Sequence, residues 1–86
     1  MSYVLDVTPD ADSVWRALNV ELQEMVVDGL DSAAQDPPMS ETTKILDFIH
    51  ERAGDRHYVF IDISFDHVAR KIIVTNVLHY VRPLAP

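Results

Sequence analysis

The sequence contains no cysteine and only two glycines. The first absence excludes cysteine chemistry, and the second argues against a disordered chain. Without cysteine the chain has no disulfide and no thiolate chemistry, which fits a reducing compartment such as the cytoplasm. Few glycines, together with a hydrophobic content of 48%, lie well outside the composition of disordered chains. We therefore expect an ordered protein.

Long apolar runs are also missing. No segment approaches the roughly 18 apolar residues that a membrane span needs, and the N-terminus lacks the basic start of a secretion signal. We expect a cytoplasmic protein with no membrane partner. With 86 residues, the chain forms one domain, residues 1–86, because a second hydrophobic core has no room.

Basic residues are scarce in the first half of the chain. Residues 1–41 hold nine acidic side chains against Arg16 alone, whereas residues 42–86 hold six basic and five acidic side chains and all four histidines. The net charge is −7. This balance argues against a general polyanion binder, which needs a field of lysine and arginine.

The clearest pattern lies in residues 56–82, where two apolar, alternating segments flank the polar sequence DHVAR. Such alternation predicts a β-hairpin. If its loop is centred near Val68, three cross-strand pairs follow: Phe65 with Lys71, Ile61 with Thr75, and His57 with His79. This register is an assumption that a slip of one residue would undo.

The N-terminal half predicts a strand over residues 2–8, ended by Pro9, and then a helical segment. Its apolar residues recur at spacings of three and four, namely Val14, Leu18, Leu22, Met25, Val26, Leu30 and Ala33. Asp10 or Asp12 is expected to cap it. Residues 10–34 form one helix, or two if Asn19 caps a second one. Gly29 is costly inside a helix and is expected to mark a close approach to the sheet.

Residues 35–43 read as a polar loop with two adjacent prolines, and residues 43–52 as a strand that turns through residues 53–55 into the hairpin. The fold class is therefore α+β: an N-terminal strand, a helix or helical hairpin, and a three-stranded antiparallel meander, with the helices packed on one sheet face.

Both faces of the predicted sheet are apolar. In the assumed register one face carries Ile45, Ile49, Val59, Ile61, Ile63, Phe65, Ile73 and Val77, and the other carries Leu46, Phe48, Tyr58, Phe60, Ile72, Val74, Leu78 and Tyr80. The helices cover only one of them. We expect a partner protein or a second copy of the chain on the other; the alternative is that the N-terminal strand or the loop 35–43 folds across it.

Polar side chains gather at the sheet end where Arg52, Arg56 and Arg82 meet. On the assumed faces, one side carries His50, Arg52, Arg56, Tyr58, Tyr80 and Arg82, and the other carries Glu51, His57 and His79. Arginine forks grip oxyanions, and a histidine or tyrosine can pass a proton, so the first group fits a phosphate site. The alternative is an ordinary solvated strand end. Glu51, His57 and His79 are metal-ligand types, but they form no recognised metal motif, and we expect neither a metal nor another cofactor.

The element order, with LQEMVVDGLDSAAQDP ending the helices and AGDRHYVFI and IIVTNVLHYVR in the sheet, resembles the RelE/ParE toxins of bacterial toxin–antitoxin modules over nearly the whole chain. The resemblance implies a small cytoplasmic toxin held inactive by a cognate antitoxin. It implies one of two activities: a RelE-like endoribonuclease that cuts mRNA on the ribosome, or a ParE-like inhibitor of DNA gyrase. A third reading is a relative that only binds a partner or forms a homodimer.

The resemblance also assigns roles residue by residue. Arg56, just after the turn at Gly54, matches a basic residue of RelE-type active sites, and His50 stands where the preceding strand often carries a base. His79 and Tyr80 occupy the end of the last strand, where an arginine is usual. These four are the candidate catalytic residues. Arg52, Arg82 and Lys44 are the candidate substrate-binding residues. Residues 83–86 do not match the C-terminal segment that supplies a tyrosine in many of these ribonucleases.

Overall fold

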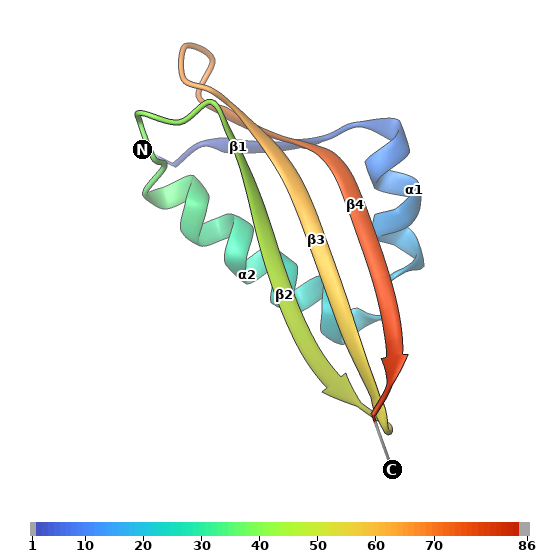
Figure 1. Cartoon of the computed structure of the whole chain (residues 1–86). Coiled ribbons are helices and arrows are strands. Elements are labelled where there is room, and N and C mark those ends of the chain that lie inside the picture. The colour runs from blue at the N-terminus through green and yellow to red at the C-terminus, as the bar shows by residue number, and fades with distance from the viewer. Residues whose placement is uncertain (1, 85–86) are drawn as a thin grey trace.

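The computed structural model describes residues 2–84 and contains one four-stranded sheet with two helices. The elements are β1 (Val4–Val7), α1 (Pro9–Ala17), α2 (Val20–Gln35), β2 (Thr43–Arg52), β3 (Asp55–Asp66) and β4 (Lys71–Pro83). The strand order is β1-β4-β3-β2, with β1 parallel to β4 and the other pairs antiparallel. In Figure 1 β2 and β3 lie in front of α2, and α1 lies beside β4; both helices contribute to one core cluster on the same sheet face. The predicted α+β class is confirmed.

The helical segment is two helices, so the second of the two alternatives is correct. Thr8 caps α1 by accepting a hydrogen bond from the Ala11 amide, and Asn19 caps α2 by accepting one from the Leu22 amide. The expected cap at Asp10 or Asp12 is wrong. Pro9 takes the first helical position, where its missing N–H costs nothing, and both aspartates lie in the first turn. Neither helix is long and apolar enough to cross a membrane.

The core forms where α2 lies on the sheet. Leu22, Val26, Leu30 and Ala34 recur every fourth residue and are buried in one cluster with Val59, Ile61 and Ile63 of β3. Gly29 lies on the same helix, and a Cβ built on it would come within 2.6 Å of Cζ of Phe48 on β2. The expected close approach of Gly29 to the sheet is therefore confirmed.

The assumed hairpin register is wrong. Asp66 pairs with Lys71, Phe65 with Ile72, Ile61 with Val77, and His57 with Val81. The four-residue turn His67 to Arg70 shifts the register by one residue. An irregularity next to Asp62 and Ile63, where Thr75 is the extra residue of β4, shifts it by one more. Such a β-bulge adds a residue to one strand only.

The pairing changes the composition of both faces. Leu46 and Phe48, rather than Ile45 and Ile49, stand beside Val59 and Ile61 on the helix-covered face. Ile72 and Val74 also belong to that face and are buried, whereas Ile73 pairs with Ser64 on the other one. Ile45 and Ile49 are 65% and 60% exposed. The predicted division of the sheet residues was therefore wrong for β2 and for the first part of β4.

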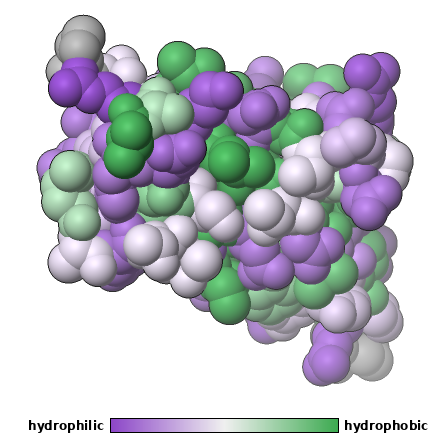
Figure 2. Space-filling model, turned by 90° about the horizontal axis from the view of Figure 1, so that it is seen from above, coloured by the Kyte–Doolittle hydropathy of each residue, from purple (hydrophilic) through white to green (hydrophobic). Residues whose placement is uncertain are grey.

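The face away from the helices, called the open face below, is not covered by the N-terminal strand. That strand pairs with the edge of β4. The loop 35–43 lies at the turn end, where the Thr42 carbonyl accepts from the Phe65 amide and the Glu41 carbonyl contacts Nε2 of His67. Figure 2 views the molecule from this end and shows hydrophobic and hydrophilic residues interspersed there. Neither internal cover suggested by the sequence therefore lies along the open face.

Candidate functional site

Two arginines stand directly opposite each other at the end of the open face remote from the β3–β4 turn. Arg56 of β3 pairs with Arg82 of β4, and Tyr58 pairs with Tyr80 one step along the same face. We call these four residues the arginine end. Like charges placed opposite each other on neighbouring strands are destabilising. A pair of facing guanidinium groups therefore fits a site that receives an anion.

Arg56 is held in place by Glu51 of β2. Its Nε and Nη2 atoms both donate to Oε1 of Glu51, at 3.1 and 2.7 Å. The Tyr58 side chain, followed by the Glu51 carboxylate, raises the pKa of Arg56, so the guanidinium remains charged. Arg82 forms no ion pair with an acidic side chain within residues 2–84. Arg56 is thus held in place by Glu51, and the guanidinium of Arg82 is left for a ligand.

Aromatic side chains line a hollow beside these cations. Tyr58, Phe60, Tyr80 and Arg82 enclose about 340 Å³, and the rings of Phe60 and Tyr80 meet edge to face with centroids 6.1 Å apart. Aromatic faces stack on unpaired bases, and arginine binds phosphate bidentately. The arrangement can therefore hold a single-stranded nucleotide through its base and its phosphate.

His50 and Arg52 do not join this site, although the sequence predicted them on the same side as Arg56. Both point to α2: Nε2 of His50 lies 3.1 Å from Oε2 of Glu21, and Nε of Arg52 lies 3.8 Å from Oε1 of Glu21. The reason is the two-residue turn at Ala53 and Gly54, both with positive φ. It pairs Arg52 with Asp55 and Glu51 with Arg56, which turns the even-numbered residues of β2 away from Arg56.

His79 also lies on the helix side. Its Nε2 is 3.0 Å from Nδ1 of His57, and the two rings stack with centroids 5.2 Å apart. The two are diagonal neighbours and not the directly opposed pair that was expected. Burial, and secondarily the charge of His57, lower the pKa of His79. Glu51 faces the other way, towards Arg56, and within residues 2–84 no group of three or more His, Asp or Glu side chains is arranged to hold a metal.

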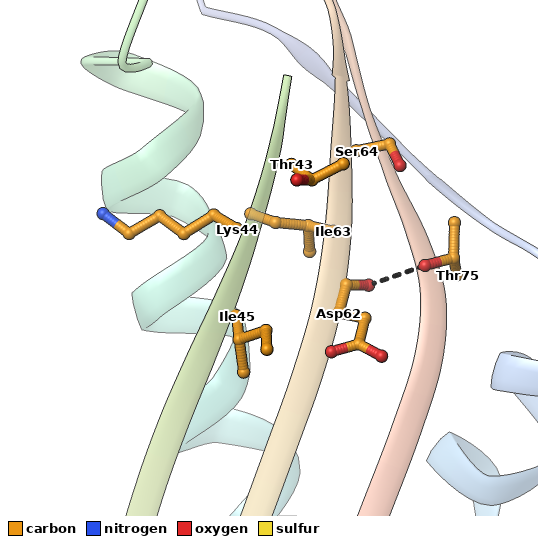
Figure 3. A pocket seen from close by; sticks show the side chains of 7 residues that line it. All are labelled: Thr43, Lys44, Ile45, Asp62, Ile63, Ser64 and Thr75. Carbon is orange, nitrogen blue, oxygen red and sulfur yellow. Dashed lines mark hydrogen bonds between the residues drawn. The ribbon is translucent and has the colours of Figure 1, made fainter. Parts of the chain in front are cut away.

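Lys44 lies towards the opposite end of the sheet. It pairs with Ile63 near the β3–β4 turn, beside a second hollow on the sheet. In Figure 3 its side chain extends away from the other side chains that line this second hollow. The hollow contains Asp62, whose backbone carbonyl accepts from Oγ1 of Thr75 at 3.2 Å. The structure therefore separates Lys44 from Arg56 and Arg82 and places a carboxylate on the open face between them.

Two members of the site were missed. Glu51 was assigned to the wrong face, and Phe60 was given no role. The turn could have revealed Glu51, since a two-residue loop of Ala and Gly between alternating segments predicts direct pairing of the residues that flank it. Phe60 follows from Tyr58 by the two-residue period of a strand.

The chain has the same fold as RelE proteins of known structure. It matches a chain of the intact Escherichia coli RelBE complex with 17% identity, 99% coverage of both chains and a TM-score of 0.64. It matches the isolated E. coli RelE toxin with 15% identity, 99% coverage of this chain and 87% of that one, and a TM-score of 0.67. It also matches a chain of the RelBE2 complex from Mycobacterium tuberculosis, with 17% identity, 93% coverage of this chain and 100% of that one, and a TM-score of 0.61.

Searches against protein-family models and against curated proteins gave no significant match. At identities of 15–17% the structural likeness establishes the shared fold. It confirms the architecture that the resemblance implied, and the residues of the arginine end must carry any argument about activity.

Proposed function

We propose that the chain is the toxin of a toxin–antitoxin module and acts as a RelE-like, ribosome-dependent mRNA endoribonuclease. The observation that carries this proposal is the arginine end: Arg56 and Arg82 opposite each other, beside Tyr58 and Tyr80, on a sheet face that neither helix covers. The RelE-type fold supports it, and two of the matched chains come from complexes with an antitoxin. A cognate antitoxin is accordingly the proposed partner.

The proposed reaction is an internal transfer at one phosphodiester. The ribose 2′-oxygen loses its proton and bonds to phosphorus, the bond from phosphorus to the 5′-oxygen breaks, and that oxygen takes up a proton. Arg56 and Arg82 offset the charge on the phosphoryl oxygens. In this scheme the Glu51 carboxylate accepts the first proton and the Tyr80 hydroxyl donates the second. His50 and His79, two of the candidate catalytic residues from the sequence, point away from Arg56.

The test is to incubate the full chain with translating ribosomes and to map mRNA cuts by primer extension. Arg56→Ala and Arg82→Ala should each lower the cleavage rate about 100-fold, which is typical for losing one group that stabilises developing charge. Tyr80→Phe should lower it while preserving the hollow. The matched control is Arg16→Ala, because Arg16 lies on α1, its side chain is 78% exposed, and its one ion pair within residues 2–84 is with Asp12. The proposal is wrong if the folded wild-type chain makes no cuts.

A ParE-like gyrase inhibitor is the second candidate. Asp47 and Asp62 favour it, because these carboxylates stand on the open face and would repel the phosphates of an RNA strand that ran along it. The arginine end also contains no histidine that could transfer protons in RNA cleavage. Inhibition of DNA supercoiling without RNA cleavage would support it. A harmless chain that forms only a stable homodimer or complex would instead favour the non-catalytic reading.

A further inference from the structure

An apolar hollow lies on the helix side, away from the arginine end. Leu5 and Val7 of β1, Trp15 of α1, and Val26, Val27 and Leu30 of α2 are among its lining residues, and its volume is about 140 Å³. A cavity of roughly 150 Å³ with apolar walls stays dry and accepts a benzene-sized group. Val7 and Val27 are 39% and 40% exposed, so the hollow is accessible. It has the size for one apolar side chain of a partner.

The surface around this hollow is strongly acidic. Glu24 and Asp31 lie three residues before and four residues after Val27, so they flank it on the exposed side of α2, with Asp28 next to them. None of these three forms an ion pair within residues 2–84. The single base of residues 1–41, Arg16, is paired with Asp12 at 2.7 Å. An occupant of the hollow must therefore bring positive charge.

Val20 indicates what shape the occupant has. It is 66% exposed and lies seven residues before Val27, which puts both on one side of α2, about 10 Å apart along the axis. A helix packed along α2 presents its own side chains at the same seven-residue spacing. A strand repeats every two residues and would not match it.

We propose that this surface docks a basic amphipathic helix that inserts one apolar side chain into the hollow, contacts Val20 with a second one seven residues away, and sets lysine or arginine against Glu24 and Asp31. Equating that helix with a segment of the antitoxin rests on the proposed function. The hollow lies between β1, α1 and α2 on the helix side of the sheet, with Ile61, Val74 and Val77 of β3 and β4 also lining it. Arg56 and Arg82 stand on the open face, so the docked helix leaves them uncovered. Binding at this surface and blockage of the arginine end are therefore separate events.

The test uses the full ¹⁵N-labelled chain and a synthetic helical peptide of about five turns with leucine on one face and lysine on the other. Two further peptides complete the set: the same pattern with glutamate in place of lysine, and a scrambled leucine–lysine sequence that cannot form an apolar face. We expect the first peptide alone to bind, with NMR shift changes confined to β1, α1, α2 and the hollow-lining residues Ile61, Val74 and Val77. The inference is overturned if the glutamate or scrambled peptide binds equally well, if no peptide binds, or if the changes fall on the open face.

Variants locate the contact. Val27→Asp and the double variant Glu24→Lys with Asp31→Lys should each weaken binding at least tenfold, and both alter exposed side chains. Matched controls on the open face are Ile49→Asp and Asp47→Lys, which should leave the affinity unchanged; equal losses in the controls would refute the assigned surface. None of these measurements involves RNA, so a failed cleavage assay and a failed docking assay remain distinguishable.

Discussion

Replacing Gly29 by alanine tests how tightly α2 lies against the sheet. The added Cβ would lie 2.6 Å from Cζ and 2.7 Å from Cε1 of Phe48, whereas carbon atoms in contact prefer about 3.5–4.0 Å. The ring must therefore move by about 1 Å. Phe48 is only partly buried but packs against the core cluster, so the movement costs about 1–3 kcal/mol as overpacking. Alanine regains about 1 kcal/mol in helix propensity.

Together, overpacking and helix propensity should lower the free energy of unfolding by about 1 kcal/mol in Gly29→Ala. A second substitution, at Phe48, should turn this loss into a gain. Phe48→Leu removes the ring atoms that the new Cβ meets, so in that background Gly29→Ala should stabilise the protein by the propensity gain of about 1 kcal/mol. The difference between the two backgrounds is the coupling energy of the pair.

Urea unfolding measures both steps. With a denaturant slope of about 1 kcal/mol/M for a small domain, Gly29→Ala should lower the midpoint by about 1 M and should raise it in the Phe48→Leu background. Ser32→Ala, on the same helix, is the control for an alanine substitution away from Phe48; it alters an exposed side chain and removes only the hydrogen bond from Oγ to the Asp28 carbonyl. It should shift the free energy of unfolding by about 0.5 kcal/mol or less. If Gly29→Ala stabilises both backgrounds equally, α2 is not in close contact with Phe48.

Two further changes probe the helix start and the histidine pair. Asn19→Ala removes the acceptor for the Leu22 amide, at 3.0 Å, and should cost about 1 kcal/mol in urea unfolding, whereas Asn19→Asp should preserve the cap. His79 has a folded-state pKa below its ordinary 6.5, so the unfolded chain binds this proton more readily. Its contribution to stability should be complete above pH 6.5 and decline as the pH falls through the lower folded value. When the free energy of unfolding is measured over this pH range, its dependence on pH should be weaker in His79→Gln than in the wild type. An unchanged pH dependence would contradict the role given to His79.

The elements of this fold follow from local patterns, and the pairing of its strands does not. The alternation of residues 43–52, the break at DHVAR and the cap residue Asn19 are local signals, and the structure has β2, the turn and α2 where they predict them. The faces depend on the register. The sequence-based prediction placed Ile45 and Ile49 on one face with Val59 and Ile61 because it ignored the parity that the turn at Ala53 and Gly54 imposes. The same error grouped His50 and Arg52 with Arg56.

Arg56, Tyr58, Tyr80 and Arg82 were nevertheless predicted on one side, and the reason is a cancellation. The assumed hairpin was off by one residue at the turn and by one more beyond the bulge at Thr75. The two shifts of one residue add up to two, and side chains alternate between the faces with a period of two. Beyond the bulge each side chain of β4 is therefore on the face that was predicted for it. Near the turn only one slip applies, and there the predicted faces are wrong, as Ile72 and Val74 show.

The bulge therefore decides the chemistry of the open face. If Thr75 were paired with Asp62 instead of bulging out, the register near the turn, which pairs Ile63 with Val74, would continue to the strand ends. Tyr58 would then stand opposite His79 and Arg56 opposite Val81, while Tyr80 and Arg82 would turn towards the helices. With the bulge, Arg56 instead faces Arg82, and His79 is stacked on His57. Thr75 stabilises this arrangement by donating from its Oγ1 to the Asp62 carbonyl. The bulge at Thr75 thus places two guanidinium groups and two tyrosines together on the open face, where regular pairing would place Arg56 and Tyr58 beside Val81 and His79.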